Sequence, residues 1–199
     1  MMDKSRQMFF EMKKKLESEN FKENVIEFEK ALEKLIEEYD TAVRENRFIV
    51  GGVIETLFCA LLNSVGFKSE LLEEERYDIK VNGEKFSLKS NFTGKGDIRL
   101  INILGTGTAE WREPTIFFIS GFGVCYADPE MGIPTKTVKD AVTINVDNIK
   151  RYLYGHNEWL INIRVPFKSK SVVTKKRSYD VAKFILKEIG SKHLSYFIT

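Results

Sequence analysis

Apolar residues recur along the N-terminal part of the chain at the spacing of α-helices. Residues 4–16 have the pattern of a short helix, and a break near residues 18–20 separates it from a longer stretch. That stretch carries one apolar stripe along a helix of about six turns, formed by Phe21, Val25, Phe28, Leu32, Leu35, Tyr39 and Val43. The stripe predicts packing against the core of the same domain. A helix–helix seam between two copies is the alternative.

A second helix is predicted over residues 48–62, and it is apolar nearly all round, which indicates burial. Glu55 is the only ionisable residue in it. A charge in such a place is costly unless it is paired or holds a metal ion. In the alternative interpretation, Gly51 and Gly52 end a preceding strand, and Glu55 caps the amides of the first helical turn.

Residues 76–89 predict a β-hairpin, because two alternating runs flank the pair Asn82-Gly83. Counting outward from that turn predicts the pairs Val81–Glu84, Ile79–Phe86, Asp78–Ser87 and Arg76–Lys89. Apolar side chains share the face that we expect in the core, namely Tyr77, Ile79, Val81, Phe86 and Leu88. The other face gathers Asp78, Ser87 and Lys89. An ordinary solvated sheet face is the alternative for this polar side.

The rest of the chain alternates between predicted strands and short helices. The expected strands are 98–104, a very apolar central strand at 115–120, 142–146 and 159–165. The expected helices are 148–153, capped by Asp147, and 179–189, capped by Ser178. The turn 91–97 holds a lone lysine between glycines and lacks the spacing of a phosphate-binding loop. Trp111 and Arg112 are predicted at an exposed loop tip, where they could contact bases, and an ordinary turn with Trp111 folded back onto the core is the alternative.

Composition is typical of one globular domain of 199 residues. No apolar run approaches the ~20 residues that cross a bilayer, and the lysine- and glutamate-rich start argues against export. Cys59 and Cys125 lie in apolar runs and are predicted to be buried thiols in a reducing compartment, hence a cytoplasmic protein.

Charge is distributed unevenly, although the net charge is only +2. A segment free of acids carries Lys168, Lys170, Lys175, Lys176 and Arg177. Such a segment is typical of phosphate binding, and a solvated loop is the alternative.

The candidate chemistry is that of a divalent cation. A buried glutamate, a strand aspartate and a neighbouring lysine suit Mg²⁺ with waters and phosphate oxygens around it. No Cys–His, Ser–His–Asp or histidine-rich arrangement accompanies them, and His156 and His193 are isolated, which indicates structural or surface roles.

The run Gly52-x-x-Glu55, then Asp78, then Ser87-Leu88-Lys89 resembles the PD-(D/E)XK nuclease superfamily. The resemblance implies an α/β fold with a restriction-endonuclease-like core, in which helices flank a central mixed sheet, and Mg²⁺-dependent cleavage of DNA. It implies that Asp78 is the metal-binding acid, Lys89 the motif lysine and Glu55 the helix carboxylate. Ser87 stands where most members have an acid, so Glu55 is expected to supply the second carboxylate.

Within that superfamily we expect a type II restriction endonuclease in a single domain, 1–199. Residues 1–46 would form N-terminal helices with a possible dimer contact, and 47–199 the catalytic core and DNA-binding loops. Metal-activated water would attack double-stranded DNA, the basic segment would grip the backbone, and Trp111 and Arg112 would contact bases. A homodimer would cut both strands of a symmetric site. The alternatives are a repair nuclease such as a junction resolvase, or a non-catalytic DNA-binding module with a degenerate site.

Overall fold

The computed structural model describes residues 3–39, 44–102, 110–138, 141–168 and 177–198. Its α-helices are α1 (Lys4–Leu16), α2 (Lys22–Glu38), α3 (Arg44–Ser64), α4 (Val146–Leu153) and α5 (Ser178–Glu188). Its strands are β1 (Ser69–Leu71), β2 (Ile79–Val81), β3 (Glu84–Asn91), β4 (Asp97–Asn102), β5 (Thr115–Ile119), β6 (Gly123–Ala127), β7 (Thr135–Val138), β8 (Ala141–Asn145) and β9 (Leu160–Ile161). Within these residues, no helix is both long and apolar enough to cross a membrane.

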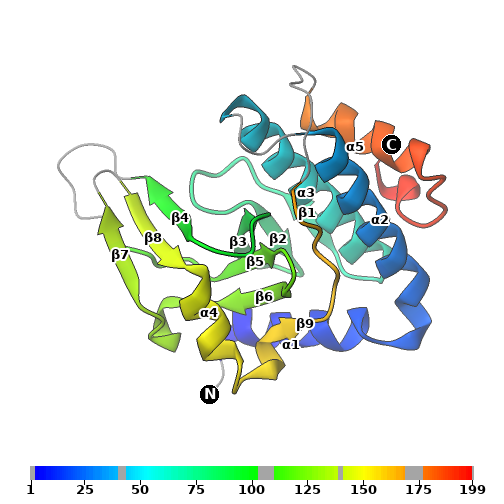
Figure 1. Ribbon diagram of the computed structural model, residues 1–199. Coiled ribbons are helices and arrows are strands. Elements are labelled where there is room, and N and C mark those ends of the chain that lie inside the picture. The colour runs from blue at the N-terminus through cyan, green and yellow to red at the C-terminus, as the bar shows by residue number, and fades with distance from the viewer. Residues whose placement is uncertain (1–2, 40–43, 103–109, 139–140, 169–176, 199) are drawn as a thin grey trace.

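The strands form two sheets. The larger sheet has six strands in the order β1-β2-β3-β5-β6-β9, and it is mixed because β3 and β5 run parallel while the other neighbours are antiparallel. The smaller sheet is antiparallel, in the order β4-β8-β7. Figure 1 shows α2, α3 and α5 on one side of the larger sheet, with the smaller sheet and α4 on the other. The predicted α/β class, a mixed central sheet flanked by helices, is confirmed.

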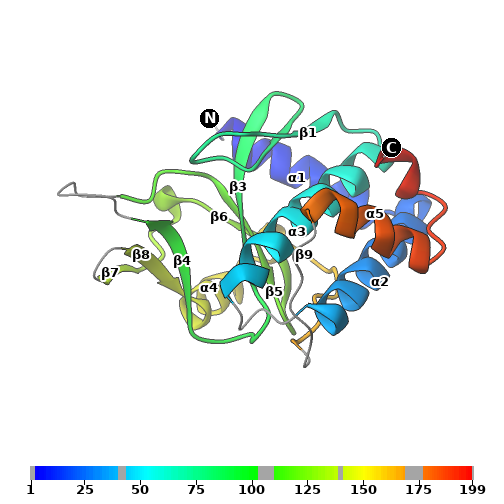
Figure 2. The ribbon, with the colours of Figure 1, turned by 90° about the horizontal axis from the view of Figure 1, so that it is seen from above.

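The central strand β5 divides the core into two parts, as its apolar run predicts. Phe118 packs against Phe58 of α3 and Phe28 of α2, with ring centroids 5.2 and 6.2 Å away. Phe117, on the opposite face, belongs to the cluster under the smaller sheet and α4. Both phenylalanines of β5 are fully buried, so the strand is covered on each side. Figure 2 shows the same layers from above, with α3 lying along the sheet.

The apolar stripe of α2 packs into this core rather than leaving a free seam. Phe28, Leu32 and Leu35 are fully buried within the chain itself. Core packing, the first of the two interpretations of this stripe, is therefore confirmed for these residues. Val43 lies outside the described residues.

Two expected helix caps and the length of one expected strand differ in the structure. Asn145, not Asp147, caps α4, because its side chain accepts a hydrogen bond from the Asp147 amide at 2.9 Å. Ser178 is the first residue of α5 and makes no capping bond. Its side chain instead packs so closely on Gly52 of α3 that a Cβ at Gly52 would lie 2.6 Å from the Ser178 hydroxyl. The strand expected at 159–165 shrinks to Leu160–Ile161, since only these residues pair with β6.

Candidate active site

The hairpin forms with the predicted turn. Asn82 and Gly83 both have positive φ, +48° and +100°, as a type I′ turn requires. Ile79 pairs with Phe86 and Val81 with Glu84, as expected. The expected pair Arg76–Lys89 does not form, because β2 begins only at Ile79. The Arg76 guanidinium instead lies 2.9 Å from the buried carboxylate of Glu113, just before β5.

Asp78 lies directly before β2, where its backbone amide still donates to the Phe86 carbonyl of β3 at 2.9 Å and its carboxylate faces the next residues of that strand. Its Oδ2 accepts a hydrogen bond from the Leu88 amide at 2.5 Å and one from the Ser87 hydroxyl at 3.0 Å. The Lys89 ammonium donates to the Ser87 hydroxyl at 2.7 Å and lies 3.6 Å from Asp78 Oδ2. The predicted cluster of Asp78, Ser87 and Lys89 is confirmed.

Glu55 lies in the interior of α3, since the helix begins at Arg44 and includes Gly51 and Gly52. The interpretation that placed Glu55 in a first turn after a strand is therefore wrong. Gly51 lies beside the Glu55 carboxylate, since a Cβ added there would be in ordinary van der Waals contact with Glu55 Oε1 at 3.8 Å. Glu55 is half-buried and forms no hydrogen bond or ion pair with any described residue.

The charges of Asp78 and Lys89 on the hairpin act on the Glu55 carboxyl. Burial and the negative charge of Asp78 together raise the pKa of the Glu55 carboxyl to about 7, and the Lys89 ammonium acts in the opposite direction. A carboxyl that feels both hairpin groups lies close to them. Residues from α3 and from both arms of the hairpin therefore converge at one place, which is the arrangement expected from the sequence.

The donor set suits a hard divalent cation. Mg²⁺ is commonly held by one or two carboxylates, with waters and substrate phosphates completing its shell. Glu55 and Asp78 supply two carboxylates, and the hydrogen bonds to Asp78 described above all reach Oδ2, leaving Oδ1 open to a ligand. Within the described part of the chain, no cluster of three or more His, Cys, Asp or Glu residues forms. The residues present fit Mg²⁺ as a two-carboxylate site.

Among the residues expected to contact DNA, some are exposed, Trp111 is buried, and others lie outside the described residues. Trp111 is buried in the core, and its indole donates a hydrogen bond to the Thr115 hydroxyl at 3.1 Å. The prediction that it lies at an exposed tip is therefore wrong, and the alternative, a turn with Trp111 folded back onto the core, is confirmed. Arg112 is exposed and pairs with Glu110 at 3.1 Å. Lys168 and Arg177 are exposed, whereas Lys170, Lys175 and Lys176 lie outside the described residues.

The remaining polar candidates have structural environments. His156 lies 3.1 Å from Glu158 and His193 lies 2.8 Å from Glu27, both at the surface. Cys59 and Cys125 are buried and unpaired, as predicted. Sequence reasoning missed Glu113, which anchors Arg76 and with it the segment that leads into Asp78. Its signal was an acid placed directly before Pro114 and the buried central strand.

No family model, curated protein or solved structure matches the chain. The functional conclusion consequently depends on the site itself.

Proposed function

We propose that this protein is a Mg²⁺-dependent endonuclease that cleaves double-stranded DNA at a short specific sequence, as type II restriction enzymes do. One observation carries the proposal: the half-buried Glu55 carboxyl has no partner among the described residues, yet it lies within the electrostatic reach of Asp78 and Lys89. A carboxyl in that position is stabilised in its charged form by a cation.

Each residue has a distinct part in the proposed reaction. Glu55 and Asp78 would hold the cation, which when bound supplies positive charge for a phosphodiester and for the attacking water. The Leu88 amide and the Ser87 hydroxyl fix Asp78 Oδ2, so Asp78 is oriented before a ligand arrives. The Lys89 ammonium, held at 2.7 Å from the Ser87 hydroxyl, is positioned to neutralise charge that develops on a phosphate oxygen.

The same proposal includes the partners of the protein, a second copy of the chain and DNA, and its location in the cell. Cutting both strands of a symmetric site calls for a homodimer. The exposed Lys168 and Arg177 would contact the DNA backbone and Arg112 a base edge, whereas the buried Trp111 is no longer a candidate for base contact. The free, buried Cys59 and Cys125 support a reducing cytoplasm.

Ser87 favours one second candidate, a DNA-binding module without catalysis. A serine at this position leaves the hairpin one carboxylate short, and no third acid joins Glu55 and Asp78 within the described residues. Such a module would bind DNA through the same surface and would leave it intact.

The test is cleavage of supercoiled plasmid with Mg²⁺ by the wild type and by Asp78→Asn, Lys89→Ala and Glu55→Gln. Glu84→Gln and Lys85→Ala are matched controls, because both residues lie on the same hairpin away from the cluster. The proposal expects cleavage by the wild type and both controls, and a loss of at least about 100-fold in the three site variants. Plasmid that stays uncut by the wild type with any divalent metal would overturn it. Digestion of a known genome, followed by end sequencing, would identify the cleaved sequence.

A further inference from the structure

Phe167 is an exposed aromatic residue whose ring packs against two glycines. The residue is 60% exposed. The outer edge of its ring lies against two glycines, Gly94 and Gly121, where an added Cβ would come within 3.0 and 2.6 Å of ring atoms. Both glycines have a φ of +66°, which side chains rarely adopt. The position of the ring thus depends on glycine at both places.

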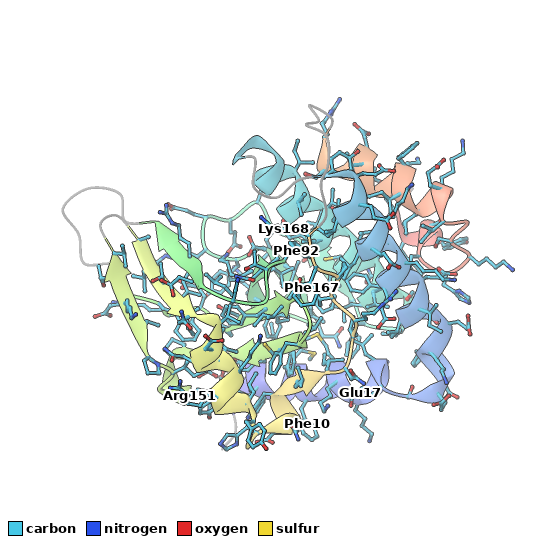
Figure 3. All side chains as sticks on the ribbon, viewed as in Figure 1. Phe10, Glu17, Phe92, Arg151, Phe167 and Lys168 are labelled. Carbon is cyan, nitrogen blue, oxygen red and sulfur yellow. The ribbon has the colours of Figure 1, made fainter. Side chains whose placement is uncertain are left out.

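The backbone around this ring is firmly tied. The Lys168 amide donates to the Phe92 carbonyl at 2.9 Å, and the Ser120 hydroxyl donates to the carbonyl of Pro166. The ring therefore projects from a fixed segment. Because more than half of the residue is exposed, at least one ring face is open. Figure 3 shows Phe92, Phe167 and Lys168 grouped together.

The turn beneath the ring is equally well fixed. The Asn91 side chain accepts hydrogen bonds from the amides of Thr93 and Gly94, at 3.0 and 2.8 Å. The Lys150 ammonium of α4 donates to the Gly94 carbonyl at 2.6 Å. This is the turn with a lone lysine between glycines, which is not a phosphate-binding loop of the Walker type. Its structure shows that Gly94 makes room for the Phe167 ring.

Two cations accompany the ring. Lys168 follows Phe167 directly, and Lys95 follows Gly94. Both lysines are exposed, and neither forms an ion pair with another described residue. Phe92 follows β3, the strand that carries Lys89, at a distance of about 10 Å of extended chain. Lys168 is thus bonded through its amide to the segment that directly follows β3, Lys95 lies in the next turn, and β3 itself carries Lys89 of the candidate active site.

We propose that Phe167 stacks on an unpaired nucleobase, while Lys95 and Lys168 take the phosphates of the same strand. Aromatic rings flanked by cations are the usual platform for unpaired bases, because every base offers a π face and every nucleotide a negative charge. An apolar protein partner would not call for the two free lysines. The inference rests on the proposed function in taking nucleic acid as the partner, and it adds an unpaired base to the substrate.

The experiment measures binding by fluorescence anisotropy in EDTA, so that no cleavage occurs. The probes are a labelled single-stranded oligonucleotide, a duplex with one unpaired base, and the fully paired duplex. The variants are Phe167→Ala, Phe167→Leu, Phe167→Tyr and Lys168→Gln. Phe10→Ala is the matched control, because Phe10 is an exposed phenylalanine of α1, 46% exposed, distant from the ring in Figure 3. Thermal unfolding of each variant verifies its fold.

We expect Phe167→Ala and Phe167→Leu to weaken binding of the two probes with unpaired bases about tenfold, and the paired duplex much less. Phe167→Tyr and Phe10→Ala should bind as the wild type does, and Lys168→Gln should reduce the salt dependence of binding. Equal affinity of Phe167→Ala and wild type for all probes would overturn the inference, as would loss of affinity in Phe167→Ala but not in Phe167→Leu. Plasmid cleavage is scored separately, so a protein that cuts DNA without using Phe167 refutes this inference and leaves the nuclease proposal standing.

Discussion

The Glu55 carboxyl of α3 and the Asp78 carboxylate ahead of β2 repel each other across the contact between the helix and the hairpin. The charge of Asp78 adds to burial in raising the pKa of Glu55 to about 7. Two carboxyls that disfavour each other's charge form a site that a cation stabilises. Lys89 offsets only part of this repulsion, which leaves room for a further positive charge.

The first prediction concerns stability against pH. The pKa of Glu55 is about 7 in the folded protein against an ordinary value of 4.5, so the folded state binds more protons between these values. The contribution of Glu55 to stability is therefore fully present below about pH 4.5 and is lost as the pH rises through 7, by an amount on the order of 3 kcal/mol. Urea unfolding of wild type and Glu55→Gln at pH 5 and pH 8 measures it.

Glu55→Gln should be more stable than the wild type at pH 8, without metal, and should have a flatter pH profile. Glu84→Gln, on the hairpin but outside the cluster, is the control and should follow the wild type. Identical pH profiles of wild type and Glu55→Gln would show that Glu55 is not the half-buried titrating group described above.

The second prediction concerns a variant, Ser87→Asp, that adds a carboxylate to the hairpin. Ser87→Asp places a negative charge beside Asp78, because the Ser87 hydroxyl lies 3.0 Å from Asp78 Oδ2. Without metal, the variant should lose about 1–3 kcal/mol of stability, since like charges then crowd the site and the bond to Asp78 is gone. With Mg²⁺ it should regain stability and bind the ion about tenfold more tightly. Denaturation and calorimetric titration measure these effects, with Ser87→Ala as the control for the lost hydroxyl.

The third prediction concerns the C-terminal segment. The Glu27 carboxylate of α2 accepts bonds from the Ser191 hydroxyl at 2.7 Å, the Lys192 amide at 2.9 Å and the His193 ring at 2.8 Å. Burial alone would raise the pKa of Glu27, but these bonds outweigh it and lower the pKa to about 2. The stabilisation is therefore present above about pH 4.5 and is lost as the pH falls toward 2.

Glu27→Gln should cost on the order of 2–3 kcal/mol at pH 7. The exposed Glu23, on the same helix, offers the control Glu23→Gln, which should cost under about 0.5 kcal/mol. Guanidinium unfolding compares the two. An equal, small cost in both variants would show that Glu27 does not hold the C-terminal segment.

Local patterns in the sequence predicted the parts of this structure that depend on local chemistry. Asn82-Gly83 identified the turn, and alternation then predicted which side chains of the hairpin meet. The apolar run 48–62 around Glu55 indicated its partial burial, because no other charged residue lies in that run. These predictions succeed because the periodicity of apolar residues and the type of turn depend on residues that are adjacent in the sequence.

The errors come from packing that local patterns do not show. Trp111 was expected at an exposed tip, but its ring packs into the core under the smaller sheet, and the hydroxyl of Thr115, the first residue of β5, satisfies its indole. Arg76 was expected opposite Lys89, and the buried Glu113 draws it away instead. The Phe167 ring packs against both Gly94 and Gly121, and no local sequence pattern connects these three residues. Such pairings are set by tertiary packing.

The most direct test of the central claim is binding of Mn²⁺, as a spectroscopic substitute for Mg²⁺, followed by electron paramagnetic resonance. We expect the wild type and Glu84→Gln to bind the ion near pH 8 and Mg²⁺ to displace it, whereas Asp78→Asn and Glu55→Gln should each weaken binding at least about tenfold. Binding by the wild type should be weaker near pH 6, where protons compete for Glu55. Absence of binding by the wild type, or undiminished binding by both site variants, would contradict the claim that Glu55 and Asp78 form one cation site.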